Sequence, residues 1–443
     1  MKNKIENAKK YLNDCINDLS KFAWLFSKNP GHDFTRNRKL PFSHIMKSIM
    51  CMSGGSLTNE LLDYFKLDPD TPSTSAFVQQ RDKLLPEAFE TLFHMFNDKI
   101  QLADLYKGYR LLAVDGSDIH IATNEDDADS FFPGVDGRKP YNLLHLNAMY
   151  DLCANIYTDV IIQKARKANE HKAFVSMVDR INDNQPTVII ADRGYESYNN
   201  LAHVQEKGLN FLIRIKDFNG NGILSGLDLP TENEYDLSLS LSLSRKQTNA
   251  MKQLYKNKNE YKLLSNNANF DYLPKYNRKS VSVKLYTLNF RVVRFKLSND
   301  TYEVIITNLP SNKFPPEELK RLYAMRWGIE TSFRGLKHTV GLITFHAKKA
   351  ESIYQEIFAS IIMYNFTQII ISNVILKQKN TKYCYKINFS ASVHICRQYI
   401  YDNISPPKIE ALLQKYMIPI RPDRNYNRKI NCKPAKGFTY RVA

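Results

Sequence analysis

The chain has 443 residues, 43% hydrophobic and 24% charged, a composition that excludes a collagen-like or disordered protein and suits two or three structural units. Its formal net charge of +17 favours a polyanionic partner, most commonly nucleic acid, over a protein that is merely basic. Six scattered cysteines, without a C-x-x-C pair or zinc spacing with histidine, argue against a zinc site and favour a reducing compartment.

Residues 1–105 are expected to form a helical DNA-binding domain, because apolar residues recur there at helical spacing. The N-terminus lacks the apolar run of a signal peptide, so we expect a cytoplasmic protein. The segments SLTNELLDYFKL and TPSTSAFVQQRDKLL are typical of two capped helices and resemble a helix-turn-helix module, although any small helical bundle with a wet surface would look similar. The polar residues that would face DNA are Arg36, Arg38, Lys39, Gln79, Gln80, Arg81 and Lys83.

Residues 106–217 change to short apolar runs rich in β-branched residues or leucine, which predict strands. Helical patterns at 170–182 and 198–207 lie between the later runs, so we expect an α/β core with a mixed sheet. The predicted strands are 110–115, 143–150, 156–163, 187–192 and 210–216.

The rest of the chain divides into an insertion, a second part of the core and a C-terminal region. Residues 218–300 carry alternating segments that predict a β-rich insertion, and residues 301–376 return to the core with a strand at 302–307. The apolar stretch 353–376 contains too many polar residues for a lipid-facing span and is expected to be a core helix. In the C-terminal region 377–443, residues 421–443 hold seven Arg and Lys against one Asp, a net charge of +6 that would suit a phosphate backbone or a solvated tail.

The segment PEELKRLYAMRWGIETSFRGLKHTVG, at 316–341, predicts an amphipathic helix. Tyr323, Arg326, Glu330 and Lys337 would fall within an arc of about 60° on a regular helix, beside an apolar stripe for the core. Arg334 would extend the polar stripe. A solvated face with intrahelical ion pairs would have the same pattern, so the meaning of the stripe depends on the other carboxylates.

Two further carboxylates follow apolar runs that are expected to be buried strands. Asp115 ends LLAVD and Asp192 ends TVIIAD, each with a glycine close behind, although a loop Asp more often caps a turn. Asp118 is an alternative to Asp115, but it more plausibly organises the turn. Three converging carboxylates would need cations between them, and oxygen ligands without His or Cys favour Mg²⁺ or Mn²⁺. A pair of such ions suits in-line displacement at phosphorus.

The motifs LLAVD-GSD, VIIAD-RGY and Y-x2-R-x3-E-x6-K together resemble the DDE transposases of bacterial insertion sequences, in the group with a Tyr-Arg-Glu-Lys signature. The similarity extends over the order of elements from about residue 30 to 375. It implies a ribonuclease-H-like core that is interrupted by the β-rich insertion and preceded by the helical domain.

The resemblance also implies roles for individual residues. Asp115, Asp192 and Glu330 would hold two Mg²⁺ ions, for which Mn²⁺ can substitute. Tyr323, Arg326 and Lys337 would contact the phosphates and terminal bases of the transposon end. Beside these, Arg334 and Arg193 are further candidates for DNA contact. The implied partners are double-stranded inverted-repeat and target DNA and a second copy of the chain in a synaptic homodimer, with no membrane, in the cytoplasm near the bacterial nucleoid.

Relatives of this kind cleave the DNA end, close it into a hairpin through a flipped base stacked on an aromatic residue, reopen it and join it to target DNA. The expected tryptophan is missing from the insertion, so Tyr302, Tyr286 or Phe290 would have to replace it. Two other functions stay open: a catalytically silent DNA-binding regulator and a metal-dependent nuclease that does not transpose. The lone histidines His120, His145 and His338 are expected to be structural.

Overall fold

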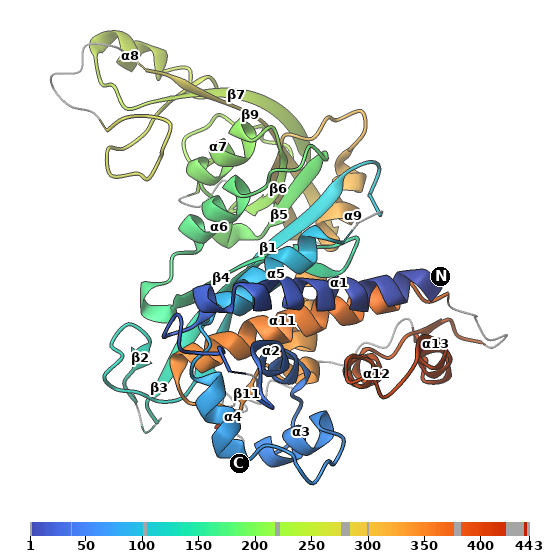
Figure 1. The fold of residues 1–443 in the computed structure, drawn as a ribbon. Coiled ribbons are helices and arrows are strands. Elements are labelled where there is room, and N and C mark those ends of the chain that lie inside the picture. The colour runs from blue at the N-terminus through green and yellow to red at the C-terminus, as the bar shows by residue number, and fades with distance from the viewer. Residues whose placement is uncertain are drawn as a thin grey trace.

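One large mixed sheet forms the centre of the computed structural model, with helices on both faces (Figure 1). The structure describes residues 2–36, 38–100, 104–135, 137, 139–217, 222–275, 284–298, 301–375, 382–421 and 438–440. The strand order in the sheet is β2-β3-β1-β5-β6-β10-β9-β7-β8, and β4 pairs with β3. The predicted α/β class with a mixed sheet is therefore confirmed.

The centre of the sheet is parallel and its flanks are antiparallel. Strand β1 pairs in parallel with β5, and β5 pairs in parallel with β6, whereas β3 and β10 run antiparallel to their neighbours. All five residues of β5 are buried, as expected for a strand that is covered on both faces. The bounds of the strands in this sheet are β1 Arg110–Ile121, β2 Phe131–Phe132, β3 Tyr141–Asp151, β4 Ile156–Lys164, β5 Thr187–Ala191, β6 Asn210–Ile215, β7 Tyr235–Ser244, β8 Tyr261–Leu263, β9 Tyr286–Ser298 and β10 Thr301–Thr307.

Alternate residues of the central strands build two separate hydrophobic cores. Leu112 and Val114 of β1 join one core with α6 (Glu170–Asp179) and α7 (Tyr198–Glu206). The intervening Leu111 and Ala113 join the other core, with α1 (Lys2–Lys21), α5 (Glu87–Asp98) and α11 (Ala350–Ser372). Figure 1 shows these two groups of helices on opposite sides of the sheet.

The N-terminal helices pack against the second core. Helix α3 (Leu57–Tyr64) begins after Ser56, whose side chain accepts a hydrogen bond from the Asn59 amide, and α4 (Thr74–Arg81) is capped by Ser73 in the same way. The two predicted capped helices are therefore confirmed. Helix α2 (Phe42–Cys51) and the 3₁₀ turn η1 (Ala23–Phe26) complete this region. Its boundary at residue 105 stays a prediction.

The segment between β6 and β10 extends the central sheet. Strand β9 (Tyr286–Ser298) pairs with β10, β7 (Tyr235–Ser244) pairs with β9, and β8 (Tyr261–Leu263) pairs with β7. Helix α8 (Asn249–Leu254) lies at the end of this extension that is farthest from α1 and α11 (Figure 1). The segment is rich in strands, and it continues the sheet of the core.

The C-terminal region begins after α11, which buries Gln355, Glu356 and Asn365 as the expected core helix. Its helices are α12 (Phe389–Ile400) and α13 (Pro406–Lys415), and its strands β12 (Tyr385–Lys386) and β13 (Ile418–Pro419) pair with each other. Its strand β14 (Thr439–Tyr440) pairs with β11 (Thr344–Phe345), which precedes α11. Most of the basic tail at 421–443 lies outside the described residues. Among the helices that the structure describes, none has the length and apolarity needed to cross a membrane.

Candidate active site

Asp115 and Asp192 lie side by side at one edge of the parallel part of the sheet. The last residue pair between β1 and β5 joins Val114 to Ala191, so the two aspartates are the next residues on adjacent parallel strands. Adjacent strands are about 4.8 Å apart, which places the two carboxylates close enough to act on one ligand. The Asp192 carboxylate also accepts a hydrogen bond of 2.7 Å from the Gly194 amide.

The prediction that Asp115 ends its strand is wrong. Strand β1 continues to Ile121, because its antiparallel pairing with β3 continues through Ile121 and Asn142 after the pairing with β5 has stopped. Asp115 therefore marks the point where β1 loses one of its two neighbours.

The segment 316–341 is helical in three unequal pieces, α9 (Pro316–Ala324), α10 (Trp327–Arg334) and the π-helical turn η4 (Gly335–Val340). The segment is helical as predicted, but the prediction of one regular helix is wrong. The amides of Arg326 and Ile329 donate to the carbonyl oxygens three residues earlier, which is the narrower 3₁₀ pattern. The π-helical turn η4 is wider than an α-helix. The four signature residues consequently do not share one uniform stripe.

Arg326 connects two of the three predicted acidic residues. Its guanidinium donates to Oε1 of Glu330 at 2.7 Å and lies 3.7 Å from Oδ2 of Asp115. The side chain is buried, and its Nε has no partner in the part of the chain that the structure describes. The nearby Tyr323 is also buried, and its hydroxyl group has no hydrogen-bond partner among the described residues.

The pKa of Asp115 records the crowding of negative charge. Burial raises this pKa to about 6, and the carboxylates of Asp192 and Glu330 act in the same direction against the Gly116 amide and Arg326. The three acidic residues predicted from the sequence therefore lie within electrostatic reach of one another.

The donor set fits a hard divalent cation, because the converging groups are carboxylates in a partly buried position. No group of three or more His, Cys, Asp or Glu side chains within the described ranges is arranged to hold a metal ion. The guanidinium of Arg326 lies between Asp115 and Glu330 instead. Binding a cation would require Glu330 to exchange its contact with Arg326 for one with the ion.

Asp118 lies further along β1, where Lys337 of η4 contacts it. The cross-strand partner of Asp118 is His145 on β3, and the Asp118 carboxylate contacts Nδ1 of His145 at 2.7 Å. Lys337 donates to the backbone oxygen of Asp118 at 2.7 Å, so η4 is fastened to β1 next to the site. This arrangement favours Asp115 over Asp118 as the acidic residue beside Asp192.

His145 links two acidic residues. Its Nε2 lies 3.0 Å from Oε1 of Glu170, the first residue of α6. Contacts with Asp118 and then Glu170 raise the pKa of His145 to about 9, so the ring is a cation at neutral pH. Glu170 was missed in the sequence, because an acidic residue in the first turn of a helix is expected for the helix dipole alone.

Gly116 leaves the space that this ion pair fills. A Cβ at position 116 would lie 2.5 Å from Nε2 of His145 and 2.9 Å from Oε1 of Glu170. We therefore expect Gly116→Ala to lower the free energy of unfolding by about 1–3 kcal/mol, the usual cost of overpacking. Chemical denaturation measures this loss. The adjacent Ser117→Ala is the control, and equal stabilities of the two variants would contradict the prediction.

The remaining residues predicted to contact DNA are exposed or belong to other clusters. Arg193 and Arg334 are exposed near the site. Arg214 was not predicted; its Nε lies 3.0 Å from the buried Glu303. Burial raises the pKa of Glu303, although the positive charges of Arg214 and Arg326 act in the opposite direction. The ion pair could not be predicted from the sequence, because a single arginine in the apolar strand β6 does not indicate a distant partner.

The aromatic residues suggested for stacking a flipped base are mostly engaged. Phe290 is buried, Tyr286 donates to Glu206 at 2.8 Å, and the ring of Tyr302 lies 4.2 Å from the Arg294 guanidinium. Trp327 is 57% exposed and lies next to Arg326, whose guanidinium is 5.5 Å from its ring. It was set aside in the sequence because it lies outside the insertion.

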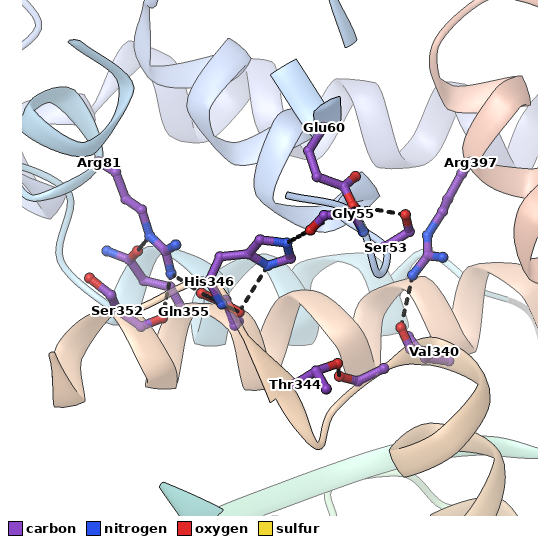
Figure 2. Close-up of polar contacts among 12 residues, drawn as sticks. Ser53, Gly55, Glu60, Arg81, Val340, Thr344, His346, Ser352, Gln355 and Arg397 are labelled. Carbon is purple, nitrogen blue, oxygen red and sulfur yellow. Dashed lines mark hydrogen bonds and ion pairs between the residues drawn. The ribbon is translucent and has the colours of Figure 1, made fainter. Parts of the chain in front are cut away.

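Arg81 cannot face DNA as predicted, because it is buried in a polar cluster between α4 and α11. It donates to Gln355 and to the Ser352 carbonyl oxygen and forms an ion pair of 2.9 Å with Glu356 (Figure 2). Arg36 and Arg38 are exposed and line a cavity of about 260 Å³ together with Lys83. Gln80, which was also predicted to face DNA, is buried, whereas Lys39 and Gln79 are exposed.

A family model described as a transposase DDE domain matches residues 106–366, more than half of the chain. The cryo-EM structure of a piggyBac transposase synaptic complex with hairpin DNA is similar at 10% sequence identity and a TM-score of 0.43, over 92% of this chain and 79% of that chain. No curated protein matches the chain.

Proposed function

This chain belongs to the family of proteins with a transposase DDE domain, and from that premise we propose that it is an insertion-sequence transposase of the Tyr-Arg-Glu-Lys group. It would bind the terminal inverted repeats of its element and catalyse Mg²⁺-dependent cleavage and transfer of DNA strands. The proposed core is ribonuclease-H-like, with residues 1–105 as a DNA-binding domain.

The observation that carries this proposal is the placement of Asp115 and Asp192 on adjacent parallel strands with Glu330 facing them through Arg326. The residues are 77 and 138 positions apart in the chain, so local sequence cannot account for their meeting. Two divalent cations bound by them would supply an activated attacking oxygen and stabilise the leaving oxygen.

The basic and phenolic groups of the signature suit a phosphate. Tyr323 and Arg326 both carry buried donors without a partner among the described residues, at the Tyr323 hydroxyl and at Nε of Arg326. Buried donors are normally paired, so an oxygen of a bound DNA phosphate is the expected acceptor. Lys337 would keep its hydrogen bond to the Asp118 carbonyl oxygen, which holds its positive charge beside β1.

Trp327 is the proposed stacking partner for an unpaired base near the cleaved end. Its exposed ring adjoins Arg326, so a base stacked there would lie next to the bound phosphate. Hairpin formation at the DNA ends is part of the proposal.

Arg334 is expected to contact the DNA backbone, because it is exposed on α10 in the turn after Glu330. Arg334→Gln should weaken binding to end DNA and lower the slope of log affinity against log salt concentration by about 1. Fluorescence anisotropy at several salt concentrations measures both quantities. Lys21→Gln removes the same charge from α1, and an equal change in that variant would show that Arg334 makes no local contact.

The function is tested by incubating the purified chain with Mg²⁺, target DNA and a duplex that carries the inverted repeats flanking the gene. We expect cleavage at the repeat, hairpin-ended intermediates and end strands covalently joined to target. Cleavage without joined products would identify a nuclease. Salt-sensitive binding without cleavage in Mg²⁺ or Mn²⁺ would identify a regulator.

Each end of an element needs its own catalytic site, so the proposed synaptic complex is a homodimer. Light scattering with and without end DNA measures the mass of the complex. A complex with one chain and two ends would contradict this part of the proposal.

A further inference from the structure

Glu170 lies beside the backbone segments that carry Asp115 and Asp192. Its Oε1 would be 2.9 Å from a Cβ at Gly116, and its Oε2 would be 3.9 Å from a Cβ at Gly194. Gly116 directly follows Asp115, and the Gly194 amide is bonded to Asp192. A carboxylate that approaches both glycines is therefore directed at the space beside both aspartates.

His145 holds this carboxylate in place. The imidazolium contacts Oε1 of Glu170 at 3.0 Å and Oδ1 of Asp118 at 2.7 Å, so Glu170 is fixed by a cation that is itself fixed to β1. The ion pair with His145 involves Oε1 of Glu170, and its Oε2 has no hydrogen-bond or ion-pair partner within the ranges that the structure describes. One carboxylate oxygen is thus anchored while the other is available.

A second observation points to a missing ligand at the same place. Tyr195 is only 2% exposed, and its hydroxyl has no hydrogen-bond partner in the described part of the chain. Burial raises the pKa of Tyr195, and Glu170, Asp115 and Asp192 raise it further, so the hydroxyl lies within reach of all three charges. A buried hydroxyl among carboxylates is ordinarily satisfied by a water molecule or a hydrated ion.

We propose that Glu170 is a fourth acidic residue of the metal centre, which places its free oxygen beside a divalent cation shared with Asp115 and Asp192. The inference rests on the proposed function, because it assumes that the aspartates bind a cation. His145 is a positioning residue in this arrangement: it neutralises one side of Glu170 and leaves the other for the ion or for a water molecule bound to it.

The carboxylates around this space also outnumber the cations that contact them. Asp115, Glu170 and Asp192 surround the space, while His145 contacts Glu170 and Arg326 lies 3.7 Å from Asp115. A divalent cation of the hard type, Mg²⁺ or Mn²⁺, would balance the excess negative charge with oxygen ligands.

The test is the affinity of the full-length chain for Mn²⁺ alone, without DNA, by isothermal titration calorimetry at pH 7. Glu170→Gln keeps the shape of the side chain and removes its charge, so we expect at least about tenfold weaker Mn²⁺ binding. The increase in melting temperature caused by Mn²⁺, relative to each variant in EDTA, should shrink in parallel. Glu125→Gln, at an exposed carboxylate, is the matched control and should bind as the unmodified chain does.

The outcomes separate the two proposals. If Asp192→Asn weakens Mn²⁺ binding and Glu170→Gln does not, the role of Glu170 is overturned while the proposed site stands. If neither weakens it, the proposed metal site itself is wrong. Should Glu170→Gln fail to fold, Glu170→Asp retains the charge and withdraws the carboxylate by one methylene group, and unchanged affinity in that variant would overturn the inference.

Discussion

Replacing Glu330 by glutamine is expected to abolish cleavage of end-containing DNA while the fold stays intact. The amide oxygen can still accept the 2.7 Å hydrogen bond from Arg326, so α10 should keep its position. The amide carries no charge and is a poor ligand for Mg²⁺. Losing several kcal/mol of transition-state stabilisation corresponds to a fall in rate of about a thousandfold or more, measured as single-turnover cleavage in Mg²⁺.

The matched control is Glu317→Gln, which changes an exposed glutamate on α9 in the same segment. It should cleave at the unmodified rate, and thermal unfolding of both variants should agree with that of the unmodified chain. Normal cleavage by a correctly folded Glu330→Gln variant would remove Glu330 from the active site.

Arg81→Met is expected to destabilise the protein by about 3–5 kcal/mol, the usual cost of leaving one charge of a buried ion pair alone. The substitution removes hydrogen bonds to Gln355 and to the Ser352 carbonyl oxygen as well as the 2.9 Å ion pair with Glu356 (Figure 2). Burial by itself would raise the pKa of Glu356, but Arg81 and His346 hold that pKa below its usual value. Urea denaturation at pH 7 measures the loss.

The pH dependence follows from the sign of that shift. A carboxylate with a lowered pKa in the folded state stabilises the protein above its unfolded pKa, and this stability is lost as the pH falls. The difference between Arg81→Met and the unmodified chain should therefore narrow below about pH 4.5, where Glu356 becomes protonated in the unfolded chain.

Two further variants test whether the unpaired charge of Glu356 causes the loss of stability. Lys83→Met removes a partly exposed cation 3.8 Å from Asp33 and should cost less than about 1 kcal/mol. The double variant Arg81→Met with Glu356→Gln should recover part of the loss, because no charge is left unpaired. An Arg81→Met variant as stable as Lys83→Met would show that the buried pair contributes little.

The Arg81 cluster also joins the N-terminal region, which is expected to bind DNA, to the core, which is expected to carry the active site. Arg81 is the last residue of α4, whereas Glu356 lies on α11 in the core. Arg397 of α12 donates to the carbonyl oxygen of Val340 at 2.8 Å, which secures the end of η4 after Lys337 (Figure 2). Arg81 therefore fastens α4 to α11, while Arg397 separately fastens α12 to the end of the helical segment 316–341.

The sequence alone predicted the features that depend on neighbouring residues. The apolar run TVIIA predicted β5, and the serines before α3 and α4 predicted their caps. The two strand-associated aspartates and the Tyr-Arg-Glu-Lys spacing predicted an acidic site, which still awaits its biochemical test. The periodicity of apolar residues in strands and helices depends on residues that are close in the sequence, so it can be recognised without the structure.

Only the tertiary structure decided which distant groups meet. The ion pair of His145 with Glu170 depends on the β1–β3 register and on where α6 begins, and Arg81 was assigned to the surface because its partner Glu356 is 275 positions away. The pairing of β1 with β3 also extended β1 beyond Asp115. Burial and charge pairing between remote segments fix these features, because their energies depend on distances in space that no local period contains.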